Sequence, residues 1–192
     1  MPRLHALLVG IDVYAEARPL TGCVNDIDAV QRLLLDRVGV SPGDVVRLAS
    51  PHDGDAHEGD VVSAPATRAN VVRALGALGG EGTRGDDRVF IYYSGHGVSV
   101  PVIDRGYRTV REALVPVDAS VSGGAADGLL LDFELSRLLG AVAKRTRHVT
   151  FVLDCCHAGG ATRDLAAHPG DRERSRRRSR APICSRLRPK GC

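Results

Sequence analysis

Two short segments carry the reactive side chains that stand out in this chain. Residues 92–97 read YYSGHG and residues 152–160 read VLDCCHAGG, so a histidine in one and two cysteines in the other follow apolar runs. Such runs are typical of buried strands, and functional groups gather at the carboxyl ends of parallel strands. If the two strands are neighbours, His96 lies close to Cys155 and Cys156, although they are far apart in the sequence.

A cysteine with a histidine in reach is the minimal thiol nucleophile. The imidazole takes the thiol proton and later protonates the leaving amine. His157 is adjacent to the cysteines, but neighbours in sequence rarely face each other, so His96 is the preferred base. Chemistry alone does not choose between Cys155 and Cys156, because strand alternation points one side chain into a crevice and the other away.

Glycines flank both reactive segments. Gly95 and Gly97 are expected to allow a sharp turn beside His96 and to leave room for a substrate backbone. Backbone N–H groups near the nucleophile, including its own, form a candidate oxyanion hole. A helix beginning just beyond the cysteines would lower the thiol pKa through its dipole.

The elements that must position these residues alternate between strand and helix patterns, which predicts a mostly parallel sheet with helices on its faces. A surface loop is predicted over residues 50–66. Residues 98–128 are predicted to be less regular and to hold a hairpin, with a strand fragment over 113–117. Thr67 and Asp132 are predicted helix N-caps, and Gly39 a helix stop. The predicted strands cover residues 4–13, 45–49, 87–94 and 148–153, and the predicted helices cover residues 25–38, 67–78 and 132–143.

Composition excludes several classes of protein. The 192 residues suffice for one core, and no apolar run approaches the roughly 20 residues that span a bilayer. We therefore expect a cytoplasmic protein with no membrane partner. The odd count of five cysteines does not favour a disulfide framework. The net charge of +3 hides an arginine-rich stretch over residues 172–190, which we interpret as a solvated tail and not as a nucleic-acid site.

With these residues in hand, the chain resembles the caspase-like cysteine peptidases (peptidase C14), specifically their metacaspase or prokaryotic branch. The matching pieces are LLVGIDVY, GCVNDIDAV, DRVFIYYSGHG, EALVPVDA and VLDCCHAGG, in the family's order across the large-subunit region. The resemblance implies an α/β, three-layer caspase-like fold (caspase-haemoglobinase) with a mainly parallel sheet flanked by helices. Residues 1–167 would form this p20-like domain and residues 168–192 a basic, disordered tail. Frequent Ala, Arg, Gly and Val favour a GC-rich bacterial source.

The resemblance also assigns roles within the site. It makes Cys156 the nucleophile and His96 its base, with the backbone of Gly97 and Cys156 as the oxyanion hole. Cys155 and Ala158 stand where the family motif has serines. Cleavage after Arg or Lys is implied by an acidic S1 pocket, in which charge-assisted hydrogen bonds would hold the basic side chain. An alternative role for Asp26 is to stabilise its helix near the N-terminus. The pocket residues implied are Asp26, Asp154, Cys23 and Ser94.

The resemblance leaves cofactor and partners open. The chemistry requires no cofactor, but many family members need calcium, so calcium activation is expected without assigned ligands. Family members continue into a small-subunit region, which this chain is expected to lack, so dimerisation or a small-subunit partner is expected. Two functions follow: a cysteine endopeptidase acting on peptides after Arg or Lys, or a catalytically silent interaction module acting through its sheet edge. The acidic residues considered for calcium are Asp53, Asp55, Glu58, Asp60, Asp86 and Asp87.

Overall fold

The chain folds around two sheets that meet end to end. The computed structural model describes residues 2–52, 61, 63–104, 106–120, 127–155 and 157–158. A five-stranded parallel sheet has the order β3-β2-β1-β4-β8, and a four-stranded sheet has the order β7-β6-β5-β9. The elements are β1 (Leu4–Ile11), α1 (Cys23–Arg32), the π-helical η1 (Leu33–Val38), the 3₁₀ turn η2 (Pro42–Asp44), β2 (Val45–Ser50), β3 (Ser63–Ala64), α2 (Arg68–Leu78), β4 (Arg88–Ser94), β5 (Gly97–Asp104), β6 (Tyr107–Leu114), β7 (Leu130–Leu131), α3 (Asp132–Arg145), β8 (His148–Asp154) and β9 (His157–Ala158).

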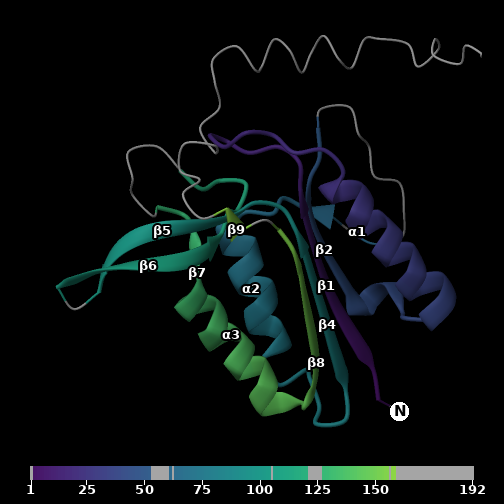
Figure 1. Ribbon diagram of the computed structural model, residues 1–192. Coiled ribbons are helices and arrows are strands. Elements are labelled where there is room, and N and C mark those ends of the chain that lie inside the picture. The colour runs from purple at the N-terminus through teal and green to yellow at the C-terminus, as the bar shows by residue number, and fades with distance from the viewer. Residues whose placement is uncertain are drawn as a thin grey trace, which may run out of the picture.

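The parallel sheet is the middle of three layers. Helix α1 covers one face, and α2 with α3 covers the other (Figure 1). Strand alternation on β4 shows the division: Val89, Ile91 and Tyr93 enter the larger core beneath α2 and α3, whereas Phe90 and Tyr92 pack toward the α1 side. The predicted three-layer α/β fold with a mainly parallel sheet is therefore confirmed.

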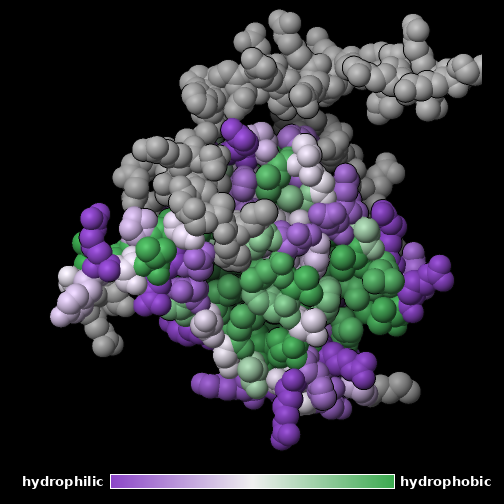
Figure 2. Space-filling model, viewed as in Figure 1, coloured by the Kyte–Doolittle hydropathy of each residue, from purple (hydrophilic) through white to green (hydrophobic). Residues whose placement is uncertain are grey.

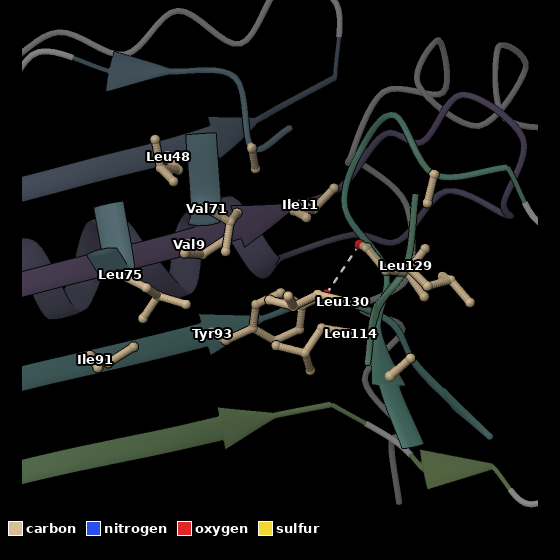
Figure 3. Packing of buried hydrophobic residues seen from close by; sticks show 14 of the residues in the cluster. Val9, Ile11, Leu48, Val71, Leu75, Ile91, Tyr93, Leu114, Leu129 and Leu130 are labelled. Carbon is tan, nitrogen blue, oxygen red and sulfur yellow. Dashed lines mark hydrogen bonds between the residues drawn. The ribbon is translucent and has the colours of Figure 1, made fainter. Parts of the chain in front are cut away.

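The second sheet joins the first where β4 gives way to β5. Strands β5 and β6 form a long antiparallel hairpin that projects from the body (Figure 1). Its base is packed into the larger core, where Tyr93 lies beside Leu114 and Leu130 (Figure 3). The hairpin predicted within residues 98–128 is confirmed, and its strands are more regular than the sequence predicts. Val98, Val100 and Val102 do show the period of two typical of a strand, and the predicted fragment over 113–117 begins within the end of β6.

The other predicted elements hold with shifted boundaries. The helix predicted from residue 25 begins at Cys23, and its second half is the π-helical η1, which ends at Gly39 with φ 75°. The predicted N-cap role of Thr67 is confirmed, because its side chain accepts the Asn70 N–H. Asp132 is instead the first helical residue of α3: the N-cap position belongs to Leu131, whose N–H donates to Glu134.

Strand β8 is the end strand of the parallel sheet within the described residues. It pairs with β4 alone, and each of its residues is exposed or half-buried. Leu153 keeps 41% of its surface exposed, and Phe133 of the neighbouring α3 keeps 54%. A band of hydrophobic surface crosses this front of the molecule (Figure 2).

The described helices include none with the length and apolar character required to cross a bilayer.

The start of α1 is held against the sheet by a residue from the segment after β1. The buried carboxylate of Asp12 accepts the N–H groups of Cys23 at 2.9 Å and Val24 at 3.4 Å. The helix also passes close to Gly10, where an added Cβ would come within 2.7 Å of the Cys23 carbonyl. Asp12 thus satisfies helix N-terminal donors that the helix itself leaves unpaired, and it sets where Cys23 and Asp26 lie.

We predict that Asp12→Ala lowers the free energy of unfolding by about 1–2 kcal/mol, because two buried N–H groups lose their acceptor. Urea unfolding followed by circular dichroism measures the change. The matched control is Asp36→Ala, which removes an exposed aspartate from η1. Equal unfolding free energies for the two variants would contradict the capping role of Asp12.

Candidate active site

The two reactive segments leave the parallel sheet side by side and enter the second sheet together. Ser94 of β4 is paired with Asp154 of β8, and a little further on Gly97 of β5 is paired with His157 of β9. The prediction that the strands bearing His96 and the cysteines are adjacent is confirmed. Cys156 and Gly159 lie outside the described residues.

The backbone of His96 is held by two tyrosine hydroxyl groups. Its N–H donates to the Tyr14 hydroxyl oxygen at 2.8 Å, and its carbonyl accepts from the Tyr93 hydroxyl at 2.8 Å. The same carbonyl accepts the Val115 N–H at 3.1 Å. Every backbone hydrogen-bonding group of His96 therefore has a partner, which fixes the peptide unit that carries the imidazole.

The His96 ring has its own supports. Its centroid lies 4.8 Å from that of the Tyr14 ring, and Nε2 lies 2.8 Å from the Arg18 carbonyl oxygen. Since a carbonyl only accepts hydrogen bonds, Nε2 must carry the proton, and Nδ1 is then the basic nitrogen of the neutral imidazole. Burial lowers the pKa of His96, although the Arg18 carbonyl partly opposes this, so the neutral base is favoured.

Gly95 is needed for close packing and not for a special backbone angle. The chain bends at Gly95 between β4 and β5, as expected, but its φ is not among the positive values of the described glycines. A Cβ at this position would lie 2.9 Å from the hydroxyl oxygens of both Tyr14 and Tyr93. Any larger residue would therefore collide with the two hydroxyl groups that hold His96. Gly97 simply begins β5, and its expected oxyanion role stays a prediction.

The four residues predicted for the acidic pocket gather on the α1 side of the sheet edge. The buried Ser94 hydroxyl donates to Asp26 Oδ2 at 3.1 Å and is hydrogen-bonded to the Cys23 thiol. Asp154 lies opposite Ser94 in the adjacent strand. Burial raises the pKa of Cys23, which keeps this thiol protonated. Asp26 and Asp154 are exposed, so their carboxylates are open to solvent and to a ligand.

Tyr92 belongs to this acidic cluster and was missed by the sequence analysis. Its hydroxyl donates to Asp154 Oδ2 at 3.0 Å. Partial burial and the nearby Asp154 and Asp26 raise the pKa of Tyr92 to about 12. The period of two along β4 could have found it, because Tyr92 precedes Ser94 by two positions and so shares its face of the sheet. Two further residues were missed: Tyr14, which ends the matching segment LLVGIDVY but was given no role, and Arg18, which acts through its backbone carbonyl and had no marker in the sequence.

Cys155 lies on the opposite side of the sheet from the acidic cluster. It is half-buried and packs against the larger core, where it interacts with Tyr93. Asp154 and Cys155 thus continue the strand alternation of β8. The thiol of Cys155 faces the hydrophobic core together with Tyr93, and the acidic cluster faces α1.

Of the residues considered for calcium, only Asp86 and Asp87 are described. Asp87 Oδ1 accepts the Arg3 N–H at 2.8 Å, and Oδ2 accepts the Arg84 N–H at 2.9 Å. These bonds, the Arg3 N–H first, lower the pKa of Asp87 to about 2. Asp87 therefore ties the amino-terminal edge of the sheet together. No cluster of three or more metal-ligating side chains occurs among the described residues, and residues 53–60 lie outside them.

Comparison with known proteins identifies the family to which this geometry belongs. Residues 4–165 match the metacaspase, peptidase C14 domain. The chain is a member of the metacaspase family. It is 32% identical over 157 residues to Metacaspase-1 of Eremothecium gossypii, covering 81% of this chain and 32% of that protein. It is 31% identical over 160 residues to Metacaspase-1A of Aspergillus terreus, covering 81% and 36%.

The fold is shared with a solved structure as well. The crystal structure of protein GSU0716 from Geobacter sulfurreducens superposes with a TM-score of 0.59 at 25% identity, over 83% of this chain and 52% of that one. The predicted metacaspase resemblance and its fold are thus confirmed. The chain spans about a third of the length of the curated metacaspases named above. The curated metacaspases named above come from fungi, so they give no support to the bacterial source that composition favoured.

We predict that Gly95→Ala lowers the free energy of unfolding by about 1–3 kcal/mol, because its methyl group would overpack the site between two hydroxyl groups. Urea unfolding measures the loss, and Tyr14→Phe in the same chain should restore part of it by removing one of the colliding oxygens. The control is Gly140→Ala in α3, where an added Cβ meets open space. A Gly95→Ala variant as stable as this control would contradict the packing described.

We also predict that the His96 imidazole titrates below 6.5, its ordinary pKa, because burial disfavours the charged ring. Because the pKa of His96 is lowered, its ring stays neutral to a lower pH than the ring of a free histidine does. An NMR titration of the histidine ring protons measures this, with His96→Gln to assign the signal. A His96 pKa at or above 6.5 would overturn the prediction.

Proposed function

We propose that this metacaspase domain is a cysteine endopeptidase in which His96 is the general base for Cys156. The observation that carries the proposal is the arrangement of His96 at the junction of the two sheets. Its peptide is held at both ends, Nε2 is bonded to a carbonyl, and Nδ1 is left as the basic nitrogen. Gly97, the next residue, is paired with His157, the residue that follows Cys156.

The proposed chemistry uses this one nitrogen twice. Nδ1 of His96 removes the thiol proton of Cys156, and the thiolate attacks the carbonyl carbon of the scissile peptide. Backbone N–H groups of Gly97 and Cys156 would stabilise the resulting oxyanion. The imidazolium then returns its proton to the leaving amine, and water hydrolyses the thioester that remains. A lowered His96 pKa suits this cycle, because the base must begin neutral.

The acidic cluster supports cleavage after a basic residue. Asp26 and Asp154 come together on the α1 side of the sheet edge, with Ser94 and Cys23 between strand and helix. Two exposed carboxylates in one site favour a cationic side chain, and a guanidinium can donate charge-assisted hydrogen bonds to both. The substrates proposed are therefore peptides or proteins with Arg or Lys at the cleavage site. Calcium activation is proposed only as a condition to test.

A second function is favoured by one observation, the unpaired outer edge of β8 within the described residues. Within the described residues this strand has a partner on one side only, and hydrophobic surface lies over it (Figure 2). An open strand edge of this kind is a template for pairing with another chain. The alternative is therefore a catalytically silent module that dimerises or binds a small-subunit partner through β8.

The test is hydrolysis of fluorogenic peptides ending in Arg, Lys or Asp, with and without calcium. We expect turnover after Arg or Lys and none after Asp. Cys156→Ala should abolish it, and His96→Ala should lower kcat/KM by about 100-fold or more, the usual contribution of a general base. His148→Ala is the matched control, because this exposed histidine lies at the far end of β8.

The same samples separate the two functions. Sedimentation velocity reports whether the folded chain self-associates. A folded chain that cleaves none of the peptides but forms a dimer would sink the peptidase proposal and favour the interaction module. Activity that survives Cys156→Ala or His96→Ala would contradict the assigned dyad while leaving a peptidase in place.

A further inference from the structure

Each carboxylate of the acidic cluster is held by one hydroxyl group from β4. Ser94 donates to Asp26 Oδ2 at 3.1 Å, and Tyr92 donates to Asp154 Oδ2 at 3.0 Å. Both donors come from the same face of one strand, two positions apart. In each case the hydroxyl group donates to Oδ2 of the carboxylate. Each hydroxyl therefore restricts the orientation of one exposed carboxylate of the same cluster.

The burial and protonation of the Tyr92 side chain suit it to hold the Asp154 carboxylate in one orientation. Its ring is half-buried and packs with the smaller core beneath α1, so the hydroxyl has little freedom to leave Asp154. Its raised pKa keeps the hydroxyl protonated over the working pH range, so that it remains a donor. Asp154 itself is exposed, and within the described residues this hydroxyl is the group that orients it.

The orientation of a carboxylate matters more for arginine than for lysine. A guanidinium is a planar fork of donors that needs a carboxylate in a matching plane. An ammonium group is a compact charge with rotatable donors, so it tolerates a carboxylate in many orientations. A group that fixes a carboxylate plane therefore adds selectivity for guanidinium ligands and adds little for ammonium ligands.

We propose that Tyr92 is a specificity-determining residue, whose hydroxyl positions Asp154 so that the acidic cluster prefers a guanidinium to an ammonium group. The inference rests on the proposed function in one respect, that this cluster receives the basic side chain of the substrate. Tyr92 acts through Asp154 and is a positioning residue, with no part in the chemical step.

The test measures binding, so it does not depend on Cys156. Dissociation constants for agmatine and for cadaverine are obtained by NMR titration at low ionic strength; both probes carry two positive charges, but only agmatine has a guanidinium. We expect the wild-type chain to bind agmatine more tightly. Tyr92→Phe should lower the cadaverine-to-agmatine ratio of dissociation constants by about five-fold, the value expected for one hydrogen bond. Tyr107→Phe, the same change at the exposed tip of the hairpin, should leave the ratio unchanged.

A double-mutant cycle then shows whether Tyr92 acts through Asp154. Asp154→Ala should remove the preference for agmatine, and adding Tyr92→Phe to it should change the ratio no further. An unchanged ratio in Tyr92→Phe overturns the inference, as does a five-fold effect that persists without Asp154, or no binding of either amine by the wild-type chain.

Hydrolysis measured in parallel separates this inference from the proposed function. Where peptides are cleaved, the ratio of kcat/KM for Arg over Lys should fall about five-fold in Tyr92→Phe, mainly through KM. Cleavage with an unaltered Arg-to-Lys ratio overturns the role of Tyr92 and leaves the peptidase intact. A Tyr92-dependent preference for agmatine in a chain that cleaves nothing supports the role of Tyr92 and removes the peptidase proposal.

Discussion

The pairing of β4 with β8 is the constraint on which the rest of the site depends. The two strands run in parallel with Ser94 opposite Asp154. Both segments of the chain then continue into the second sheet, where Gly97 is opposite His157. This shared crossing brings the histidine segment and the cysteine segment to one edge. A register shift of one residue would turn every side chain of β8 to the other face, and Asp154 would leave the acidic cluster.

Strand β4 serves two faces of the molecule at once. Tyr93 points toward the larger core and holds the carbonyl of His96, whereas Tyr92 and Ser94 point toward α1 and hold the two carboxylates. Hydroxyl groups are suited to both tasks because they donate hydrogen bonds without adding charge. Neutral donors therefore orient the His96 peptide on one face and two carboxylates on the other, without adding a charge beside either.

Much of this arrangement could be predicted from the sequence. The apolar runs of β1, β4 and β8 predicted a parallel sheet, and the residues that follow them predicted that His96 lies at its carboxyl edge beside the cysteine segment. The residues of the acidic cluster were implied by the metacaspase resemblance. The prediction succeeded because the apolar pattern of a strand is local, and because functional groups gather at the carboxyl ends of parallel strands. A hairpin was predicted in the region of β5 and β6, but its regular strands were not, because proline and polar residues interrupt their apolar pattern.

The sequence by itself determined the fold class, the metacaspase family and the residues Cys23, Asp26, Ser94, His96 and Asp154 as a candidate set. Only the tertiary structure decided which groups hold that set in place: the Asp12 cap on α1, the Tyr14 hydroxyl and Arg18 carbonyl on His96, and the Tyr92 hydroxyl on Asp154. Most of these supports come from segments distant in sequence. A periodic pattern shows which face a side chain occupies, but hydrogen-bond partners depend on how separate elements pack, and one of these partners is a backbone carbonyl whose residue type carries no information.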